Sequence, residues 1–211
     1  MIKKINAILV QNVLKKTGLT LFSVLDYQRI LDVKNYSSAR SNISRYLKLG
    51  LIQKARKGLY FLTDNSPSNF EIANKIYQPS YISFETALSF YGIIPETIYE
   101  VTSATTRFPR KFNVNNIRFS YKKIKKDCFN GYKSLKYKNS YILIAEPEKA
   151  LADYLYFVAL GVKQVIYERI NLGKIQKNKL LVYAQSFKKK KILDLINQLY
   201  AQPKLDKRII H

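Results

Sequence analysis

Between Tyr36 and Leu49 the sequence places short polar and basic side chains at the spacing of one helix face. That face would comprise Arg40, Ser41, Ser44, Arg45 and Lys48. Arginine can donate two hydrogen bonds to a guanine, and serine can contact a base or a phosphate. A helix exposing these groups suits the major groove of DNA. We therefore expect these residues to contact double-stranded DNA.

The opposite face of this helix is apolar and should pack against the rest of a small domain. It comprises Ala39, Ile43, Tyr46 and Leu47. We expect the helix within residues 38–49. Ser37 or Ser38 could cap it, because a serine hydroxyl accepts from the free N–H groups of a first turn. Gly50 follows the last turn, where a left-handed residue is favoured.

A short basic hairpin should follow. Residues 51–54 and 59–63 are typical of two strands, joined by a turn over residues 55–58, and Gly58 can take a positive φ. Three cations would project from the hairpin toward a phosphate backbone or minor groove, namely Lys54, Arg56 and Lys57. With earlier helices expected over residues 3–16 and within 24–32, this is the outline of a winged helix-turn-helix. The alternative is any small helix-plus-hairpin domain with a solvated charged face.

The charge balance favours a polyanionic partner. The 211 residues include 37 Lys and Arg against 14 Asp and Glu, a formal net charge of +23. An A+T-rich coding sequence would also enrich Lys, Ile, Asn and Tyr. Residues 107–138 hold eleven basic side chains against Asp127, with aromatic residues between them. This region is either a second nucleic-acid surface or a set of strands with solvated lysines.

The residues that enzymes use are scarce. The single histidine is His211, the last residue, so Cys128 has no evident partner to activate it. One cysteine and one histidine cannot form a zinc cluster, and glycine-rich phosphate loops are absent. We expect no catalytic residues, no metal, no cofactor and no enzymatic activity. A metal-dependent nuclease is a less favoured alternative, because the acid-x-Lys triplet at residues 32–34 falls inside the expected DNA-binding domain.

Neither a membrane nor an oxidising compartment is indicated. No segment approaches the roughly 20 apolar residues of a membrane span. A single cysteine excludes an internal disulfide and suits a reducing cytoplasm. We therefore expect a cytoplasmic protein without a membrane partner.

The chain should fold as two domains of the α+β class. Asp64 to Asn69 reads DNSPSN, a composition typical of a linker, so we place the domains at residues 1–66 and 67–211. The second should be a mixed α/β domain with a small, mostly antiparallel sheet. We expect its strands at residues 99–104, 117–122, 132–136 and 140–145. We expect its helices at residues 70–77, after Ser83, from Pro147, and at 165–171, 176–186 and 192–200.

Three sequence blocks in the second domain resemble a known family. They are Pro79–Glu96, Val101–Arg107 and Glu146–Tyr156. Together with the Gly58-Leu59-Tyr60 wing, they are similar to the abortive-infection type IV antitoxin family, often called AbiEi-like. The resemblance implies a bacterial two-domain protein of phage defence. Its N-terminal winged helix represses the operon's own promoter, and its C-terminal domain counteracts a nucleotidyltransferase-like toxin without a stable complex.

The resemblance also singles out polar residues inside these blocks. They are Glu85, Glu96, Thr105, Thr106, Arg107, Glu148 and Lys149. These could form a functional site of the antitoxin domain, or they could only support helix starts. The function expected is a DNA-binding transcriptional autorepressor and antitoxin, acting on an inverted repeat near its own promoter. The alternative is a transcriptional regulator without a toxin partner, whose C-terminal domain senses a ligand or mediates assembly.

Overall fold

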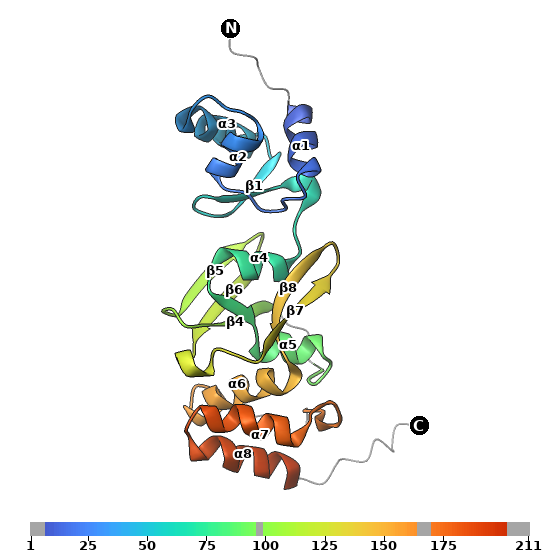
Figure 1. Ribbon diagram of the computed structural model, residues 1–211, viewed down its shortest axis with the longest axis vertical. Coiled ribbons are helices and arrows are strands. Elements are labelled where there is room, and N and C mark those ends of the chain that lie inside the picture. The colour runs from blue at the N-terminus through green and yellow to red at the C-terminus, as the bar shows by residue number, and fades with distance from the viewer. Residues whose placement is uncertain (1–6, 96–98, 164–169, 202–211) are drawn as a thin grey trace, which may run out of the picture. The chain divides into compact units, whose positions relative to one another are not determined.

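The computed structural model describes residues 7–95, 99–163 and 170–201 (Figure 1). It is an α+β fold, as the sequence predicted. The chain divides into two compact units, Met1–Ile76 with Val114–Asn116, and Tyr77–Asn113 with Ile117–His211. Helix α4, at Asn69–Ile76, groups with the first unit, whereas the sequence analysis assigned those residues to the second domain.

The first unit consists of helices followed by a hairpin. Its elements before α4 are α1 at Ala7–Lys16, α2 at Val24–Ile30, α3 at Tyr36–Lys48, β1 at Ile52–Arg56, β2 at Leu59–Leu62 and the 3-10 turn η1 at Thr63–Asn65. Helix α2 begins with a reciprocal cap. The Ser23 hydroxyl accepts from the Asp26 N–H at 3.1 Å, and the Asp26 carboxylate accepts from the Ser23 N–H at 2.8 Å. This pair fixes where α2 starts.

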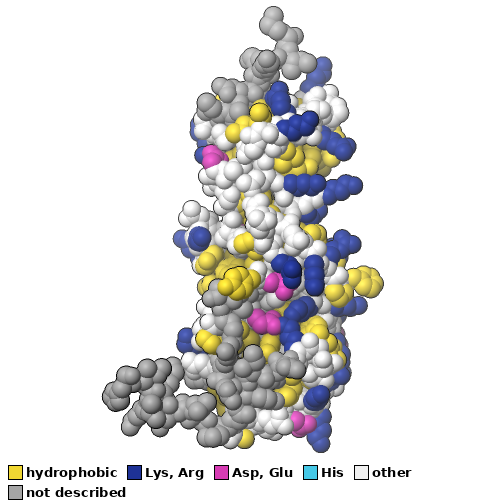
Figure 2. Space-filling view, turned by 180° about the vertical axis from the view of Figure 1, so that it is seen from behind, with side chains coloured by type: hydrophobic (Ala, Val, Ile, Leu, Met, Phe, Trp, Pro, Cys, Tyr) yellow, Lys and Arg dark blue, Asp and Glu magenta, His cyan; other side chains and the backbone are white. Residues whose placement is uncertain are grey.

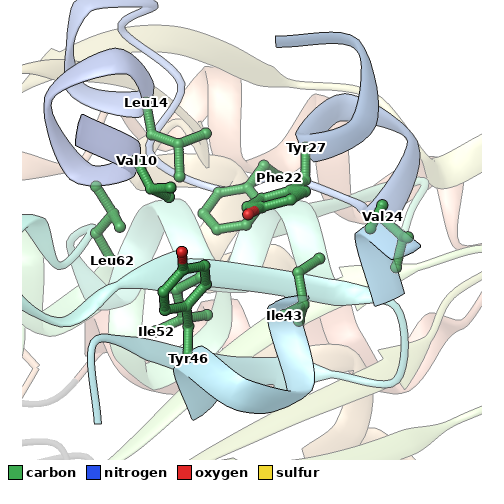
Figure 3. Close-up of a cluster of buried hydrophobic side chains, with 10 residues drawn as sticks. Val10, Leu14, Phe22, Val24, Tyr27, Ile43, Tyr46, Ile52 and Leu62 are labelled. Atoms are coloured by element: carbon green, nitrogen blue, oxygen red, sulfur yellow. The ribbon is translucent and has the colours of Figure 1, made fainter. Parts of the chain in front are cut away.

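A single apolar cluster holds these elements together (Figure 3). Its labelled members are Val10, Leu14, Phe22, Val24, Tyr27, Ile43, Tyr46, Ile52 and Leu62. They come from α1, α2, α3, both strands of the hairpin and the segment before α2, which supplies Phe22. The apolar face predicted for α3 is confirmed, since Ala39, Ile43 and Tyr46 are buried and Leu47 packs against the cluster.

The segment before α2 extends the hairpin. Phe22 and Tyr60 form an isolated antiparallel bridge, in which each residue's N–H donates to the other's carbonyl at 2.9 Å. Phe22 itself is 1% exposed, so its ring anchors this bridge in the core. The connection between α1 and α2 is thereby fixed against β2, which sets the position of α2 and α3 on the hairpin.

The second unit is built on a six-stranded sheet in the order β5-β6-β4-β3-β8-β7. The strands are β3 at Ser80–Ile82, β4 at Glu100–Thr105, β5 at Arg110–Val114, β6 at Ile117–Lys123, β7 at Tyr132–Tyr137 and β8 at Ser140–Ala145. Strand β3 pairs antiparallel with β4 and parallel with β8. Strands β4 and β6 are parallel, and β7 and β8 are antiparallel. The sheet is therefore mixed, and its two parallel pairings were not anticipated.

In the second unit, the described helices lie between β3 and β4 and after β8. They are α5 at Phe84–Phe90, α6 at Pro147–Ala159, α7 at Lys177–Ser186 and α8 at Lys190–Ala201, with 3-10 turns η2 at Lys126–Cys128 and η4 at Leu172–Lys174. Figure 1 shows α6, α7 and α8 stacked together below the strands. Pro147 occupies the first turn of α6, as predicted. The helix expected at residues 165–171 lies mostly outside the described residues.

Candidate nucleic-acid interface

Helix α3 starts at a cap that the sequence analysis missed. Asn35 is the N-cap, and its side-chain oxygen accepts from the Ser38 N–H at 2.9 Å. The same oxygen accepts a hydrogen bond from the Ser37 hydroxyl at 2.9 Å. The expected caps, Ser37 and Ser38, therefore lie inside the first turn. Helix α3 therefore begins at Tyr36, two residues before the expected start at residue 38.

The polar face of α3 is exposed along its length. Each of the five residues predicted to contact DNA is exposed, namely Arg40, Ser41, Ser44, Arg45 and Lys48. The same five residues line an open hollow of about 390 Å³. The two faces of α3 are thus cleanly divided, since the buried members of the helix are Ala39, Ile43 and Tyr46. The surface offers arginine and lysine donors and serine hydroxyls on one side of one helix.

Arg45 contacts the buried residue that follows it in the chain. Its Nη2 donates to the Tyr46 hydroxyl at 3.3 Å, and its guanidinium carbon lies 5.1 Å from the centre of the Tyr46 ring. Tyr46 is only 2% exposed. Tyr27 belongs to the same buried cluster, and burial raises the pKa of its hydroxyl well above the usual range. The Arg45 guanidinium therefore packs against the buried ring of Tyr46.

The hairpin differs in detail from the prediction. Strand β1 runs to Arg56, so the turn contains two residues, Lys57 and Gly58, instead of four. The pairing register shifts between Lys54 and Arg56, and Ala55, which lies between them, is buried. Ala55 was expected in the turn. It lies inward because the bulge gives β1 one extra residue.

The basic side chains of the hairpin are on its outside. Lys54, Arg56 and Lys57 are all exposed. Arg56 Nη1 donates to the Lys57 carbonyl at 3.0 Å, which orients the guanidinium along the turn. Gly58 has a φ of +80°, the left-handed conformation that glycine adopts without strain. A cationic tip therefore follows α3 within ten residues of the chain.

Basic side chains are not confined to this surface. Figure 2 shows Lys and Arg spread over much of the visible face, with few Asp and Glu between them. The basic side chains on this face are therefore not confined to one element. Charge alone does not single out α3. What distinguishes α3 is the combination of serine hydroxyls and arginines on one helix face.

Several of the polar residues singled out in the second domain make contacts within the fold. Glu85 is half-buried and is paired with Lys122, 3.8 Å away, and with Lys163. Glu148 is buried, and its Oε1 accepts from the Gln176 N–H at 3.1 Å, at the start of α7. These contacts hold the fold together. Glu96 lies outside the described residues.

Thr105 and Arg107 act on the loop that precedes β3. The Thr105 hydroxyl donates to the Pro79 carbonyl at 2.7 Å, and Arg107 Nη1 donates to the Gln78 carbonyl at 3.0 Å. The Arg107 guanidinium also lies 4.7 Å from the centre of the Tyr77 ring. The two side chains therefore fix this loop against the end of β4. Thr106, between them, is half-buried.

Lys149 belongs to a buried polar cluster whose central residue, Asp153, the sequence analysis missed. Lys149 and Asp153 are both fully buried and form an ion pair one helical turn apart in α6. The Tyr81 and Ser83 hydroxyls donate to Asp153 Oδ2 at 3.0 and 2.7 Å. Burial raises the pKa of Asp153, while Lys149 opposes that shift.

Ser83 shows how this cluster departs from the sequence-based expectation. It is the N-cap residue of α5, as predicted, but its side chain makes no capping hydrogen bond. Its hydroxyl donates instead to Asp153, seventy positions along the chain. A carboxylate in the apolar stripe of α6 was the one available signal, since a buried charge needs partners.

Other chemistry is sparse among the described residues. No group of three or more His, Cys, Asp or Glu side chains within residues 7–95, 99–163 and 170–201 is placed to hold a metal ion. Cys128 is buried, and its thiol donates to the Ser186 carbonyl at 3.3 Å. None of the helices in the described part of the chain is both long and apolar enough to cross a membrane.

No protein-family model matches the chain, and a search of curated proteins finds no match.

Proposed function

We propose that this protein is a DNA-binding transcriptional repressor of its own promoter, and that its first unit is a winged helix-turn-helix module. The order of elements supports this assignment. Three helices, a bridge strand before the second of them, and a closing hairpin match the plan of that module. In this plan α3 is the recognition helix and the β1–β2 hairpin is the wing.

One observation carries the proposal. The five residues on the polar face of α3 are all exposed and line a single hollow, while the opposite face is buried in the core. Arg40, Ser41, Ser44 and Arg45 are the residues that would read base edges. Lys48, Lys54, Arg56 and Lys57 would hold phosphates, which fix orientation without reading sequence.

A binding titration tests this proposal. The full-length protein is titrated onto a fluorescent duplex taken from upstream of its own gene, and onto a shuffled duplex of equal length and composition. Both titrations use the same salt concentration, because phosphate contacts make affinity strongly salt-dependent. We expect the upstream duplex to bind at least about a thousandfold more tightly. Equal affinity for both duplexes would reduce the protein to a nonspecific polycation.

We further propose, from the resemblance of the second domain, that the protein acts as an antitoxin in a type IV system. In this role it would oppose a nucleotidyltransferase-like toxin encoded beside it, without a stable complex. The resemblance in the blocks Pro79–Glu96, Val101–Arg107 and Glu146–Tyr156 is the support for this role. The contacts of Thr105, Arg107 and Glu148 are ones that the fold itself uses.

Co-expression tests the antitoxin role directly. The neighbouring reading frame is induced alone and together with the full-length protein, and growth is followed. An Arg45→Ala variant of the full chain separates the two activities, because it should lose repression while still restoring growth. The antitoxin role is contradicted if the product of the neighbouring reading frame does not stop growth, or if it stops growth and the full-length protein does not restore it. The protein would then be a regulator without a toxin partner.

A further inference from the structure

A second hollow in the protein lies where strands β4, β5 and β6 meet. It has a volume of about 400 Å³. Its lining residues are Glu100, Pro109, Arg110, Lys111, Ser120, Tyr121 and Lys122. This volume falls within the roughly 300–1,000 Å³ typical of small-molecule sites. We call it the β5–β6 pocket.

The strand pairing explains why these side chains converge. Ser120 and Lys122 are two residues apart on β6, so their side chains share a face of the sheet. Glu100 lies on the neighbouring strand β4, two residues before Thr102, which is the direct partner of Ser120. Lys111 comes from β5, on the other side of β6. Three adjacent strands therefore supply the polar groups.

Two buried polar atoms in this pocket have no partner. The Ser120 side chain is 3% exposed, and its Oγ makes no hydrogen bond to any described residue. Glu100 Oε1 is likewise buried and without a hydrogen-bond partner in the described part of the chain. Leaving such groups unpaired costs about 1–3 kcal/mol each, so a ligand that hydrogen-bonds to them would be stabilised in this pocket.

The charges around the pocket favour an anion. Three basic side chains, Arg110, Lys111 and Lys122, line it against one acidic side chain, Glu100. Burial lowers the pKa of Lys122, Glu100 opposes that shift, and the like charge of Lys111 adds to it. Lys111 and Lys122 line the same pocket, and an anion bound between two like charges is attracted by both.

We propose that the β5–β6 pocket binds the phosphate group of a small ligand that also carries a hydroxyl group, such as a sugar phosphate or a nucleotide. The ammonium group of Lys111 pairs with the phosphate, and Lys122, whose Nζ lies 3.8 Å from Glu85 Oε2, turns from that carboxylate to the phosphate. The Ser120 hydroxyl donates to one of the phosphate oxygens. A phosphate monoester carries a charge of about −1.5 to −2 at pH 7, which matches the surplus of two cations in the lining. Glu100 Oε1 accepts from the ligand's hydroxyl.

The role of Glu100 separates this ligand from a bare anion. A carboxylate beside a phosphate site repels inorganic phosphate, so it is useful only when the ligand brings a donor of its own. Glu100→Gln removes the repulsion and weakens the acceptor. This substitution should therefore raise the affinity for inorganic phosphate. It should also reduce the difference in affinity between a hydroxylated phosphate ligand and inorganic phosphate. The site is separate from α3, and the inference does not depend on DNA binding.

Calorimetric titration of the full-length protein tests the proposal. The probes are ribose 5-phosphate, adenosine monophosphate, inorganic phosphate and unphosphorylated ribose, at constant ionic strength. We expect saturable binding of the two phosphorylated sugars and none of ribose. Tighter binding of adenosine monophosphate would identify a nucleotide as the ligand class, and equal binding would identify a sugar phosphate.

Matched variants distinguish a site from general basicity. Lys111→Ala should weaken ribose 5-phosphate binding roughly tenfold or more, as loss of a charge-assisted contact does. Ser120→Ala should also weaken it, while Lys133→Ala, an exposed lysine on β7, should not. The proposal is overturned if neither phosphorylated sugar binds saturably, or if Lys111→Ala and Lys133→Ala have equal effects.

Discussion

The Arg45 guanidinium lies against the ring of Tyr46, its chain neighbour, with Nη2 3.3 Å from the Tyr46 hydroxyl. Arg45 belongs to the exposed polar face of α3, whereas Tyr46 belongs to the buried face and is 2% exposed. The core thereby restrains a side chain that belongs to the surface. A restrained arginine loses less conformational entropy on binding than a free one, which favours base recognition over loose phosphate contact.

Replacing Asn35 with alanine should shorten α3 at its start. Loss of an N-cap costs about 0.5–2 kcal/mol, so the free energy of unfolding should fall by about that amount. Ser38→Ala is the matched control, because the Ser38 backbone N–H is the donor and its side chain is exposed. Chemical denaturation of both variants measures the difference. A larger loss of unfolding free energy for Ser38→Ala than for Asn35→Ala would show that Ser38 is the N-cap, as the sequence suggested.

Removing the cation at the hairpin tip should weaken DNA binding without changing its selectivity. Lys57 is exposed in the two-residue turn. Lys57→Ala should reduce the slope of log affinity against log salt by about 1, as loss of one phosphate contact does. The measurement is a set of titrations at several salt concentrations on the upstream and shuffled duplexes. Lys75→Ala, in α4, is the control. An identical change of slope for Lys75→Ala would show that the hairpin makes no specific contact with the DNA.

Lys149 should be indispensable to the fold of the second unit. Lys149→Met leaves Asp153 as an uncompensated buried carboxylate, which typically costs about 3–5 kcal/mol. The double variant Lys149→Met with Asp153→Leu removes both charges and should recover much of the loss. Thermal unfolding of the single and double variants tests this. A single variant as stable as the wild type would show that Asp153 is satisfied by Tyr81 and Ser83 alone.

Tyr183 should make stability depend on pH through Glu146. The Tyr183 hydroxyl donates to Glu146 Oε2 at 2.6 Å, and this bond, with Lys179, lowers the pKa of Glu146 from its ordinary 4.5. A carboxyl with a lowered folded-state pKa contributes stability above its unfolded pKa, and that contribution is lost as the pH falls through the folded-state value.

Tyr183→Phe should therefore destabilise the protein at pH 7 and flatten the fall in stability below about pH 4.5. Unfolding midpoints measured between pH 3 and pH 7 test this expectation. Tyr141→Phe is the control, because Tyr141 is 70% exposed. A pH profile unchanged by Tyr183→Phe would mean that the Tyr183 hydroxyl does not set the Glu146 pKa.

The elements with a clear hydrophobic period were predictable from the sequence. The strand at residues 140–145 was found with its observed bounds, because its alternation is bounded by turn residues. Strand β3 was missed, since it has three residues, all buried, and so shows no alternation. Strand β5 was missed because its residues are mostly polar and it lies at the edge of the sheet.

Among the polar sites, only the one formed by a single helix was predictable from the sequence. The exposed face of α3 follows from helical spacing alone, so its five residues were predictable. The Asp153 cluster depends on hydroxyls from β3 and the start of α5, which only the folded chain brings to α6. The β5–β6 pocket likewise draws its residues from three strands, one of which the sequence did not reveal. Local periodicity carries no information about such contacts.

The most direct test of base recognition by α3 is the effect of Arg45→Ala on two DNAs. Anisotropy titrations compare the upstream and shuffled duplexes at one salt concentration, with Lys75→Ala as the control variant. We predict a loss of about 1–3 kcal/mol on the upstream duplex and almost none on the shuffled one. Equal losses on both duplexes would make Arg45 a phosphate contact, and no loss on either would contradict the assignment of α3 as the recognition helix.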